Sequence, residues 1–310
     1  MRASSTFNEL AAPLLYRSIR IDNYSRPFEA PPPMDSKDRL SDDTVSNVNH
    51  IKTFHYGYHT KEQCFLPPGS NPLEISILNI SPLWDDRYLH PQSDLCPCIF
   101  RISPSKLVFG PKIGYHVLDH ITEFPRAETI AFVFDLAAGP GRFDDIICMK
   151  LFMRASAAKR AVFVLWHDPK KTSSDIDSCT RTMWSYFQDR LHRYSCWPYC
   201  PKEVLFVNMD TFMTRLRPKD LETMSRRKAA TAYASRERKR MLKGGEDRFT
   251  VFRDAARLVQ VNFISMPTYL THCDWEGVIS DGQAAPWLDA MNQRKQGTNG
   301  ERKRKRSEME

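Results

Sequence analysis

Short runs of apolar residues recur along this chain, rich in β-branched and aromatic side chains and separated by polar or helix-length segments. Short runs of this composition are typical of β-strands. The pattern therefore predicts eight strands. The runs are SIRI (18–21), IKTFHY (51–56), ISILNI (75–80), KLVFG (106–110), TIAFVFD (129–135), AVFVLWHD (161–168), EVLFVNMD (203–210) and LVQVNFISM (258–266).

The spacing of these runs indicates an α/β fold. Helices are predicted at 114–124, 143–157 and 173–192, so strands and helices alternate along the second half of the chain. Such alternation implies parallel strands joined by right-handed crossovers. Two architectures fit: an irregular array with one short parallel strand in each repeat, or a doubly wound, Rossmann-like sheet.

Composition divides the chain into four parts. Residues 22–48 are rich in Pro, Asp and Ser and poor in aliphatic side chains, which predicts a disordered loop. Residues 292–310 predict a disordered basic tail. Between them, 49–291 is expected to form one α/β repeat-like domain. Residues 1–21 form a separate N-terminal element, a helix followed by the first strand.

The N-terminal element STFNELAAPLLYRSIRI (5–21) resembles the closing helix of an F-box and the strand after it, as found in fungal F-box proteins. Phe7, Leu10, Ala11 and Leu14 are spaced to lie on one face of a helix. The resemblance implies that Phe7, Leu10 and Leu14 contact a protein, the adaptor subunit of an SCF ubiquitin ligase. It also implies a degenerate leucine-rich-repeat-like array after the F-box, in agreement with the strand spacing.

The first two helices of an F-box would lie upstream of Ser4, so we expect adaptor binding only if an F-box is completed there. On this interpretation the protein is a non-enzymatic substrate receptor, or a truncated relative of one. It would hold an unknown client protein and need no cofactor.

A competing hypothesis concerns IAFVFDLAAGPGRF (130–143), which resembles motif I of class I methyltransferases. In that alternative, Asp135, Gly139, Gly141 and Asp168 would bind S-adenosylmethionine, because glycines let backbone N–H groups approach a ligand at the start of a helix. At least three strand-like runs precede this one, whereas the motif normally lies on the first strand. We therefore expect a structural turn and no enzymatic activity.

Cysteine and histidine residues form two loose clusters whose spacings differ from those of zinc sites, and no metal is predicted. Without a signal sequence, the cysteines are expected to be reduced thiols. The clusters are Cys96, Cys98, His116 and His120, and Cys179, His192, Cys196 and Cys200.

The net charge of +8 is concentrated in two places, the segment 215–248 and the tail. Residues 225–243 predict an exposed basic helix, and its pattern lacks the features of a specific nucleic-acid reader. No stretch is apolar enough to predict a membrane span. A run in the tail resembles a nuclear-import signal, so nucleus, cytoplasm or both are expected. The run comprises Arg302, Lys303, Arg304, Lys305 and Arg306.

Overall fold

A computed structural model provides the structure of this protein. It describes residues 17–21, 50–57, 73–80, 102–110, 126–135, 158–169, 201–208 and 260–293, together with six helical residues outside these ranges, Ala11, Leu14, Lys228, Ala232, Ser235 and Arg236. Its contacts divide the chain into two units. The first comprises Met1–Phe132 and Asp144–Ala161, and the second comprises Val133–Phe143 and Val162–Glu310.

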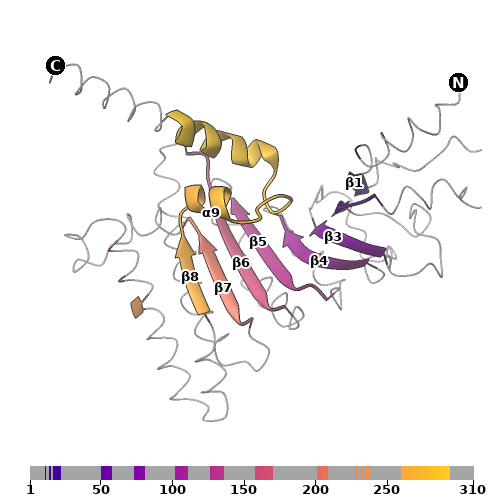
Figure 1. Ribbon diagram of the computed structural model, residues 1–310, viewed down its shortest axis with the longest axis horizontal. Helices are drawn as coiled ribbons and strands as arrows, with labels where there is room; N and C mark the ends of the chain where they lie inside the picture. The colour runs from indigo at the N-terminus through magenta and orange to yellow at the C-terminus, as the bar shows by residue number, and fades with distance from the viewer. Residues whose placement is uncertain are drawn as a thin grey trace, which may run out of the picture. The chain divides into compact units, whose positions relative to one another are not determined.

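The described residues form one eight-stranded sheet (Figure 1). Its strand order follows the chain without a reversal, from β1 to β8. The recorded strand pairs are all parallel. The strands are β1 (Ser18–Ile21), β2 (Thr53–Tyr56), β3 (Leu73–Ile80), β4 (Ile102–Phe109), β5 (Thr129–Asp135), β6 (Arg160–Trp166), β7 (Glu203–Val207) and β8 (Gln260–Ile264).

In the first unit, one face of the sheet carries two rows of large apolar side chains. Side chains alternate between the faces of a strand, so residues in register across neighbouring strands share a face. The second row lies two residues closer to the carboxyl ends of the strands than the first, and in it Phe109 and Phe132 stack with ring centroids 5.2 Å apart. All eight side chains are buried. The rows are Phe54, Leu78, Leu107 and Ile130, and Tyr56, Ile80, Phe109 and Phe132.

The other face of the first unit is more polar. Its two rows begin on β1 with Ser18 and Arg20, both exposed, and mix polar side chains with buried apolar ones such as Ile77 on β3 and Val108 on β4. The rows in register are Ser18, Thr53, Ile77, Lys106 and Thr129, and Arg20, His55, Asn79, Val108 and Ala131.

In the second unit, phenylalanine rings stack from strand to strand. Phe163 lies 6.3 Å from Phe134 and 5.0 Å from Phe206, and Phe206 lies 5.2 Å from Phe263, measured between ring centroids. The ring planes differ by 2° to 16°. Side-chain ladders of this kind stabilise parallel strands that present the same residue type at equivalent positions.

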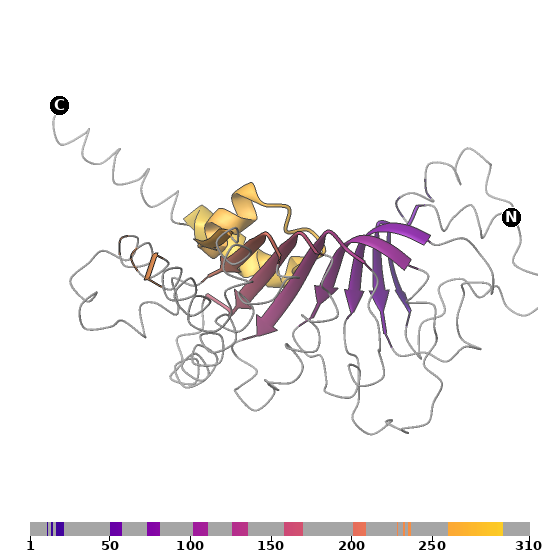
Figure 2. The same ribbon diagram turned by 90° about the horizontal axis from the view of Figure 1, so that it is seen from below.

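Helical residues follow β8 and lie at the carboxyl ends of β6 to β8, over one face of these strands (Figures 1 and 2). Helix α9 (Met266–His272) begins at Ser265, whose hydroxyl accepts a hydrogen bond from the Thr268 backbone N–H. A second helical segment covers 281–293. Its start is a capping box, in which Ser280 and Gln283 each accept a backbone N–H of the other.

Aromatic side chains join the second helical segment to the end of β6. The Trp166 indole N–H donates to the Gln283 carbonyl oxygen at 2.8 Å, and the Trp287 indole N–H donates to the His167 carbonyl oxygen at 2.9 Å. Trp166 lies three residues after Phe163, so it belongs to the face away from the stacked rings. The helical segment therefore covers that second face.

The eight predicted strands and the α/β class are confirmed. The predicted helices at 114–124, 143–157 and 173–192, and the predicted loop at 22–48, lie outside the described residues. The boundary of the predicted disordered tail differs, because the helix continues to Gln293. The remainder of the tail lies outside the described residues.

Strand β4 is longer than predicted, since it begins at Ile102 rather than at Lys106. The sequence Ser103-Pro104-Ser105 hid this extension, because proline is rare inside a sheet. Pairing with β5 begins only at Lys106, so Pro104 lies where β4 extends beyond that neighbour. A missing N–H is tolerated at such a local edge.

Candidate functional site

In the second unit, the sheet edge formed by the carboxyl ends of the strands carries two of the four residues proposed for the cofactor site. Asp135 ends β5, and Asp168 follows β6 by two residues; both side chains are half-buried. Parallel neighbouring strands bring both acids to the same edge, which is the edge where α/β sheets bind ligands. Gly139 and Gly141 lie outside the described residues, so the glycine turn itself has no described geometry.

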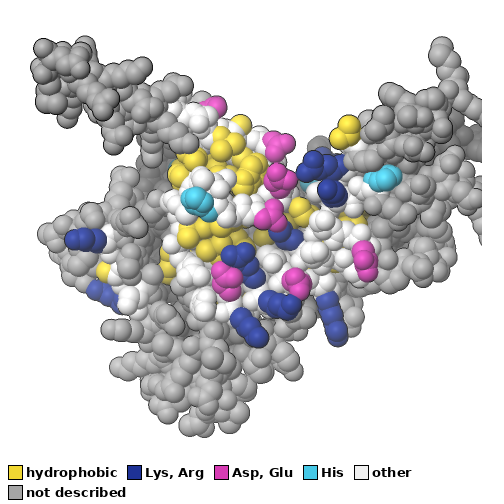
Figure 3. Space-filling model, viewed as in Figure 1, with side chains coloured by type: hydrophobic (Ala, Val, Ile, Leu, Met, Phe, Trp, Pro, Cys, Tyr) yellow, Lys and Arg dark blue, Asp and Glu magenta, His cyan; other side chains and the backbone are white. Residues whose placement is uncertain are grey.

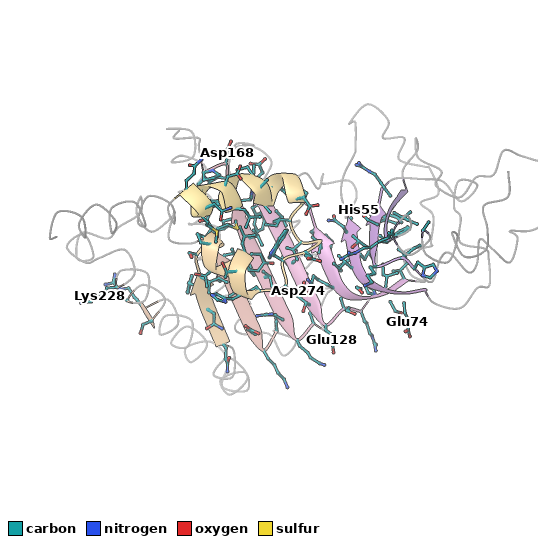
Figure 4. All side chains as sticks on the ribbon, turned by 45° about the horizontal axis from the view of Figure 1, so that its top comes forward. His55, Glu74, Glu128, Asp168, Lys228 and Asp274 are labelled. Carbon is teal, nitrogen blue, oxygen red and sulfur yellow. The ribbon has the colours of Figure 1, made fainter. Side chains whose placement is uncertain are left out.

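The described part of this edge is packed by the chain's own aromatic side chains. His167 is buried, and its ring meets Trp287 edge to face with centroids 5.1 Å apart. The His167 Nδ1 donates to the Asp168 carbonyl oxygen at 3.0 Å. Figure 4 shows Asp168 next to the helical residues that follow β8. Beside Asp168 the sheet edge is thus occupied by Trp287 and His167.

Asn208, immediately after β7, holds the ends of three strands together. Its backbone has φ 69°, the left-handed region that asparagine enters more readily than most residues. The buried side chain donates through Nδ2 to the Leu165 carbonyl oxygen at 2.8 Å, and its backbone N–H donates to the Ile264 carbonyl oxygen at 2.8 Å. Sequence reasoning missed Asn208; an asparagine directly after an apolar run was the available signal.

In the first unit, polar side chains cluster on the face away from the stacked rings. His55 Nε2 lies 3.2 Å from Ser18 Oγ, and the register places Arg20 and Asn79 on either side of His55. Burial lowers the pKa of His55, and the nearby positive charge of Arg20 lowers this pKa further. We call this set the donor face; it comprises Ser18, Arg20, Thr53, His55, Asn79 and Lys106.

The donor face does not have the composition of a nucleophilic site. A Ser–His pair needs a third group that orients the histidine, usually a carboxylate. Among the described residues of β1 to β4 the only acid is Glu74, which shares the face of Leu78 and Ile80 and therefore lies on the other side of the sheet. Figure 4 shows His55 and Glu74 well separated. The described side chains of this face provide hydrogen-bonding groups, among them the buried Asn79 Oδ1 acceptor, and two cations that interact within the chain.

Charged side chains at the amino ends of the strands form a mixed, exposed surface (Figure 3). Lys159 and Glu128 pair there at 2.6 Å, and this hydrogen bond and the lysine charge lower the pKa of Glu128. Both side chains are solvent-exposed, and ion pairs of this type contribute little to stability.

The described residues hold no group of three His, Cys, Asp or Glu side chains arranged for a metal ion. The two cysteine and histidine clusters noted in the sequence lie outside the described residues, as does the proposed import signal at 302–306. No helix among the described residues is long and apolar enough to cross a membrane.

The N-terminal residues predicted to contact a protein are described in part. Leu14 is helical and 75% exposed, and Ala11 is helical and half-buried, whereas Phe7 and Leu10 lie outside the described residues. In the basic segment, the described residues are helical, and Lys228 and Arg236 are exposed. For these residues the prediction of an exposed basic helix is confirmed.

These features define an α/β protein with an all-parallel sheet, a packed carboxyl edge in one unit and a polar sheet face in the other. Comparison with family models, with curated proteins and with solved structures returned no match.

Proposed function

We propose that this protein is a non-enzymatic interaction protein, an F-box-type substrate receptor of an SCF ubiquitin ligase or a truncated relative. The observation that carries the proposal is the sequential order of eight parallel strands. In this interpretation the strands belong to an irregular leucine-rich-repeat-like array, and the surfaces of that array hold a client protein. The client and the adaptor are the partners, and no cofactor is required.

The strand order favours a repeat-like array over a doubly wound sheet. A doubly wound sheet reverses its strand order at one point, and the cofactor binds in the crevice that this reversal opens. Here the order runs from β1 to β8 with no reversal. Right-handed crossovers that always step in one direction leave all connections on the same side of the sheet, as in a solenoid. The phenylalanine ladder of the second unit supports the same view, because equivalent positions of successive strands carry the same residue type.

The N-terminal helix supports an adaptor-binding role. Leu14 is one of two large apolar side chains exposed in the described part of the chain, and the other is Leu288. An exposed leucine costs little by itself, but a helical residue of this type is well suited to anchor a partner helix. In the F-box resemblance, this side chain belongs to the adaptor-facing module.

The alternative function is an S-adenosylmethionine-dependent methyltransferase that uses the loop after Asp135. It is favoured by one observation, that Asp135 and Asp168 are half-buried at the same sheet edge. The packing of Trp287 on His167 weakens it, since aromatic side chains occupy the described edge next to Asp168.

Two experiments test the proposal. The endogenous protein, tagged at its C-terminus, is expected to co-precipitate the SCF adaptor from its own cells, and Leu14→Asp is expected to abolish the capture. Leu288→Asp is the matched control, because it changes the other exposed leucine in the same way. Retention of the adaptor by the Leu14 variant would remove the assigned role of this helix.

The second experiment titrates the purified chain with S-adenosylmethionine by calorimetry. No saturable binding is expected. Saturable binding that Gly139→Arg abolishes would overturn the proposal and establish the methyltransferase alternative.

A further inference from the structure

Strand β8 is the last strand of the sheet, and among the described residues no strand pairs with its outer edge (Figure 1). Backbone hydrogen bonds of 2.8 Å join Gln260 and Ile264, at the two ends of β8, to residues at the ends of β7. Alternate residues of a strand direct their backbone groups to opposite sides. The N–H and C=O groups of Val261 and Phe263 therefore point away from β7, along the outer edge.

The side chains of β8 leave its outer edge open to a further strand. Burial falls at the end of the ring ladder, since Phe206 is fully buried and Phe263 is only half-buried. Gln260 and Asn262 are exposed. Proteins commonly protect a sheet edge with charged side chains or proline, and β8, with the sequence QVNFI, has neither. The edge strand at the other end of the order, β1, carries the exposed charge of Arg20.

The residues of β8 match a second copy of the same strand in antiparallel orientation. A two-fold axis at Asn262 pairs all five residues of β8 with the five residues of the other copy. In this register Val261 of each copy lies opposite Phe263 of the other, and because their backbone groups point outward, each of these pairs exchanges two N–H···O bonds. The two Asn262 residues lie opposite each other, so their exposed amides can hydrogen-bond, and no like charges meet.

We propose that two copies of this chain associate through the outer edges of β8, with Asn262 on the two-fold axis. The paired strands continue the sheet of one copy into the other. A five-residue strand is only about 17 Å long, so the interface is small and the dimer is expected to be weak and concentration-dependent. The inference is separate from the proposed receptor function, which depends on the N-terminal helix of Leu14 and not on β8.

The first test measures the mass of the purified full chain by size-exclusion chromatography with light scattering, from about 1 μM to about 1 mM. The mass is expected to rise with concentration from 36.0 kDa toward twice that value. Asn262→Lys places two like charges opposite each other and is expected to raise the dissociation constant of the dimer about fivefold or more.

Gln260→Lys is the matched control, because it also replaces an exposed amide of β8 by lysine. In the proposed register the two Gln260 residues lie four positions apart along the paired strands, roughly 14 Å, which exceeds the Debye length of about 8 Å at physiological salt. This variant is expected to change the dissociation constant less than about twofold. Both side chains are exposed, so both variants are expected to fold, which circular dichroism checks.

A second test locates the axis by disulfide cross-linking. Opposite residues of a non-hydrogen-bonded antiparallel pair have Cα atoms about 4.5 Å apart, within the range that a disulfide spans. Asn262→Cys is therefore expected to form a covalent dimer under mild oxidation, detected on a non-reducing gel, whereas Gln260→Cys is not. The parent chain is oxidised in parallel, because it contains eight cysteines of its own.

Three results would overturn the inference. A mass of 36.0 kDa at every concentration would mean that the edge of β8 does not pair with a second copy. Equal effects of Asn262→Lys and Gln260→Lys on a dimer would place its interface elsewhere. Cross-linking of Gln260→Cys as readily as Asn262→Cys would contradict the antiparallel register.

Discussion

Replacing Asn208 by alanine removes two features of the end of β7 at once, a side-chain hydrogen bond and a backbone preference. The side chain is 1% exposed, and its Nδ2 donates to the Leu165 carbonyl oxygen at 2.8 Å. Alanine leaves this carbonyl group buried without its amide donor. It also places an alanine at φ 69°, a conformation that asparagine enters more readily than alanine does.

The magnitude follows from these two costs. An unsatisfied buried acceptor costs about 1–3 kcal/mol. The left-handed conformation adds roughly 1–2 kcal/mol for an ordinary L-residue. Asn208→Ala is therefore expected to lower the free energy of unfolding by about 2–5 kcal/mol. Asn208→Gly loses the same hydrogen bond but tolerates φ 69°, so it is expected to be less destabilising than Asn208→Ala. The difference is smaller than the full backbone strain, because glycine also gains entropy in the unfolded chain.

Urea unfolding followed by circular dichroism measures the difference. With an m-value of about 3 kcal/mol/M, a loss of 3 kcal/mol lowers the urea midpoint by about 1 M. Hydrogen exchange then reports whether the loss is located at β7 and β8, because the Asn208 backbone N–H bonds to the end of β8. An alanine variant as stable as the parent would refute the assigned hydrogen bond. A glycine variant less stable than the alanine variant would refute the argument from backbone conformation.

Three further expectations follow from the packing and electrostatics of the described residues. Phe206→Ala, in the middle of the ring ladder and fully buried, is expected to lose about 3–5 kcal/mol of unfolding free energy, while Phe206→Leu retains most of it. Trp287→Phe keeps an aromatic side chain but loses the 2.9 Å bond to the His167 carbonyl oxygen, and the free energy of unfolding in urea is expected to fall by about 1–3 kcal/mol. The pKa of His55, followed by NMR titration, is expected to lie below 6.5 and to rise in Arg20→Gln. As the pH falls below 6.5, His55 binds a proton in the unfolded chain before it does so in the folded protein. The free energy of unfolding is therefore expected to fall between pH 6.5 and the folded pKa of His55. An unperturbed pKa of His55 would contradict this expectation.

Strands of this protein could be predicted from sequence because both faces of the central strands are buried. In β5 and β6 every interior side chain is buried, so the sequence itself is a continuous apolar run. The start of β4 could not be predicted in this way. There Ser103 and Ser105 are exposed while Ile102 and Pro104 are buried, but the sequence Ser-Pro-Ser has the composition of a loop.

The candidate sites depend on contacts that are distant in sequence. Ser18 and His55 are 37 residues apart and meet only through the register of β1 and β2. Trp287 is 120 residues from the His167 carbonyl oxygen to which it donates. A local pattern carries no information on such pairs. The glycine turn after Asp135 is a local sequence pattern, whereas the packing beside Asp168 depends on Trp287, which lies far along the chain.

The side chains on the second face of a strand match what covers that face. In the second unit, the face away from the stacked rings carries Val164 and Trp166, and the helical residues 281–293 cover it. Parallel strands with apolar second faces require such a cover from their own chain. In the first unit, the corresponding face begins with exposed Ser18 and Arg20, whose side chains need no apolar cover. Among the described residues, the helical cover therefore lies where the second face is apolar.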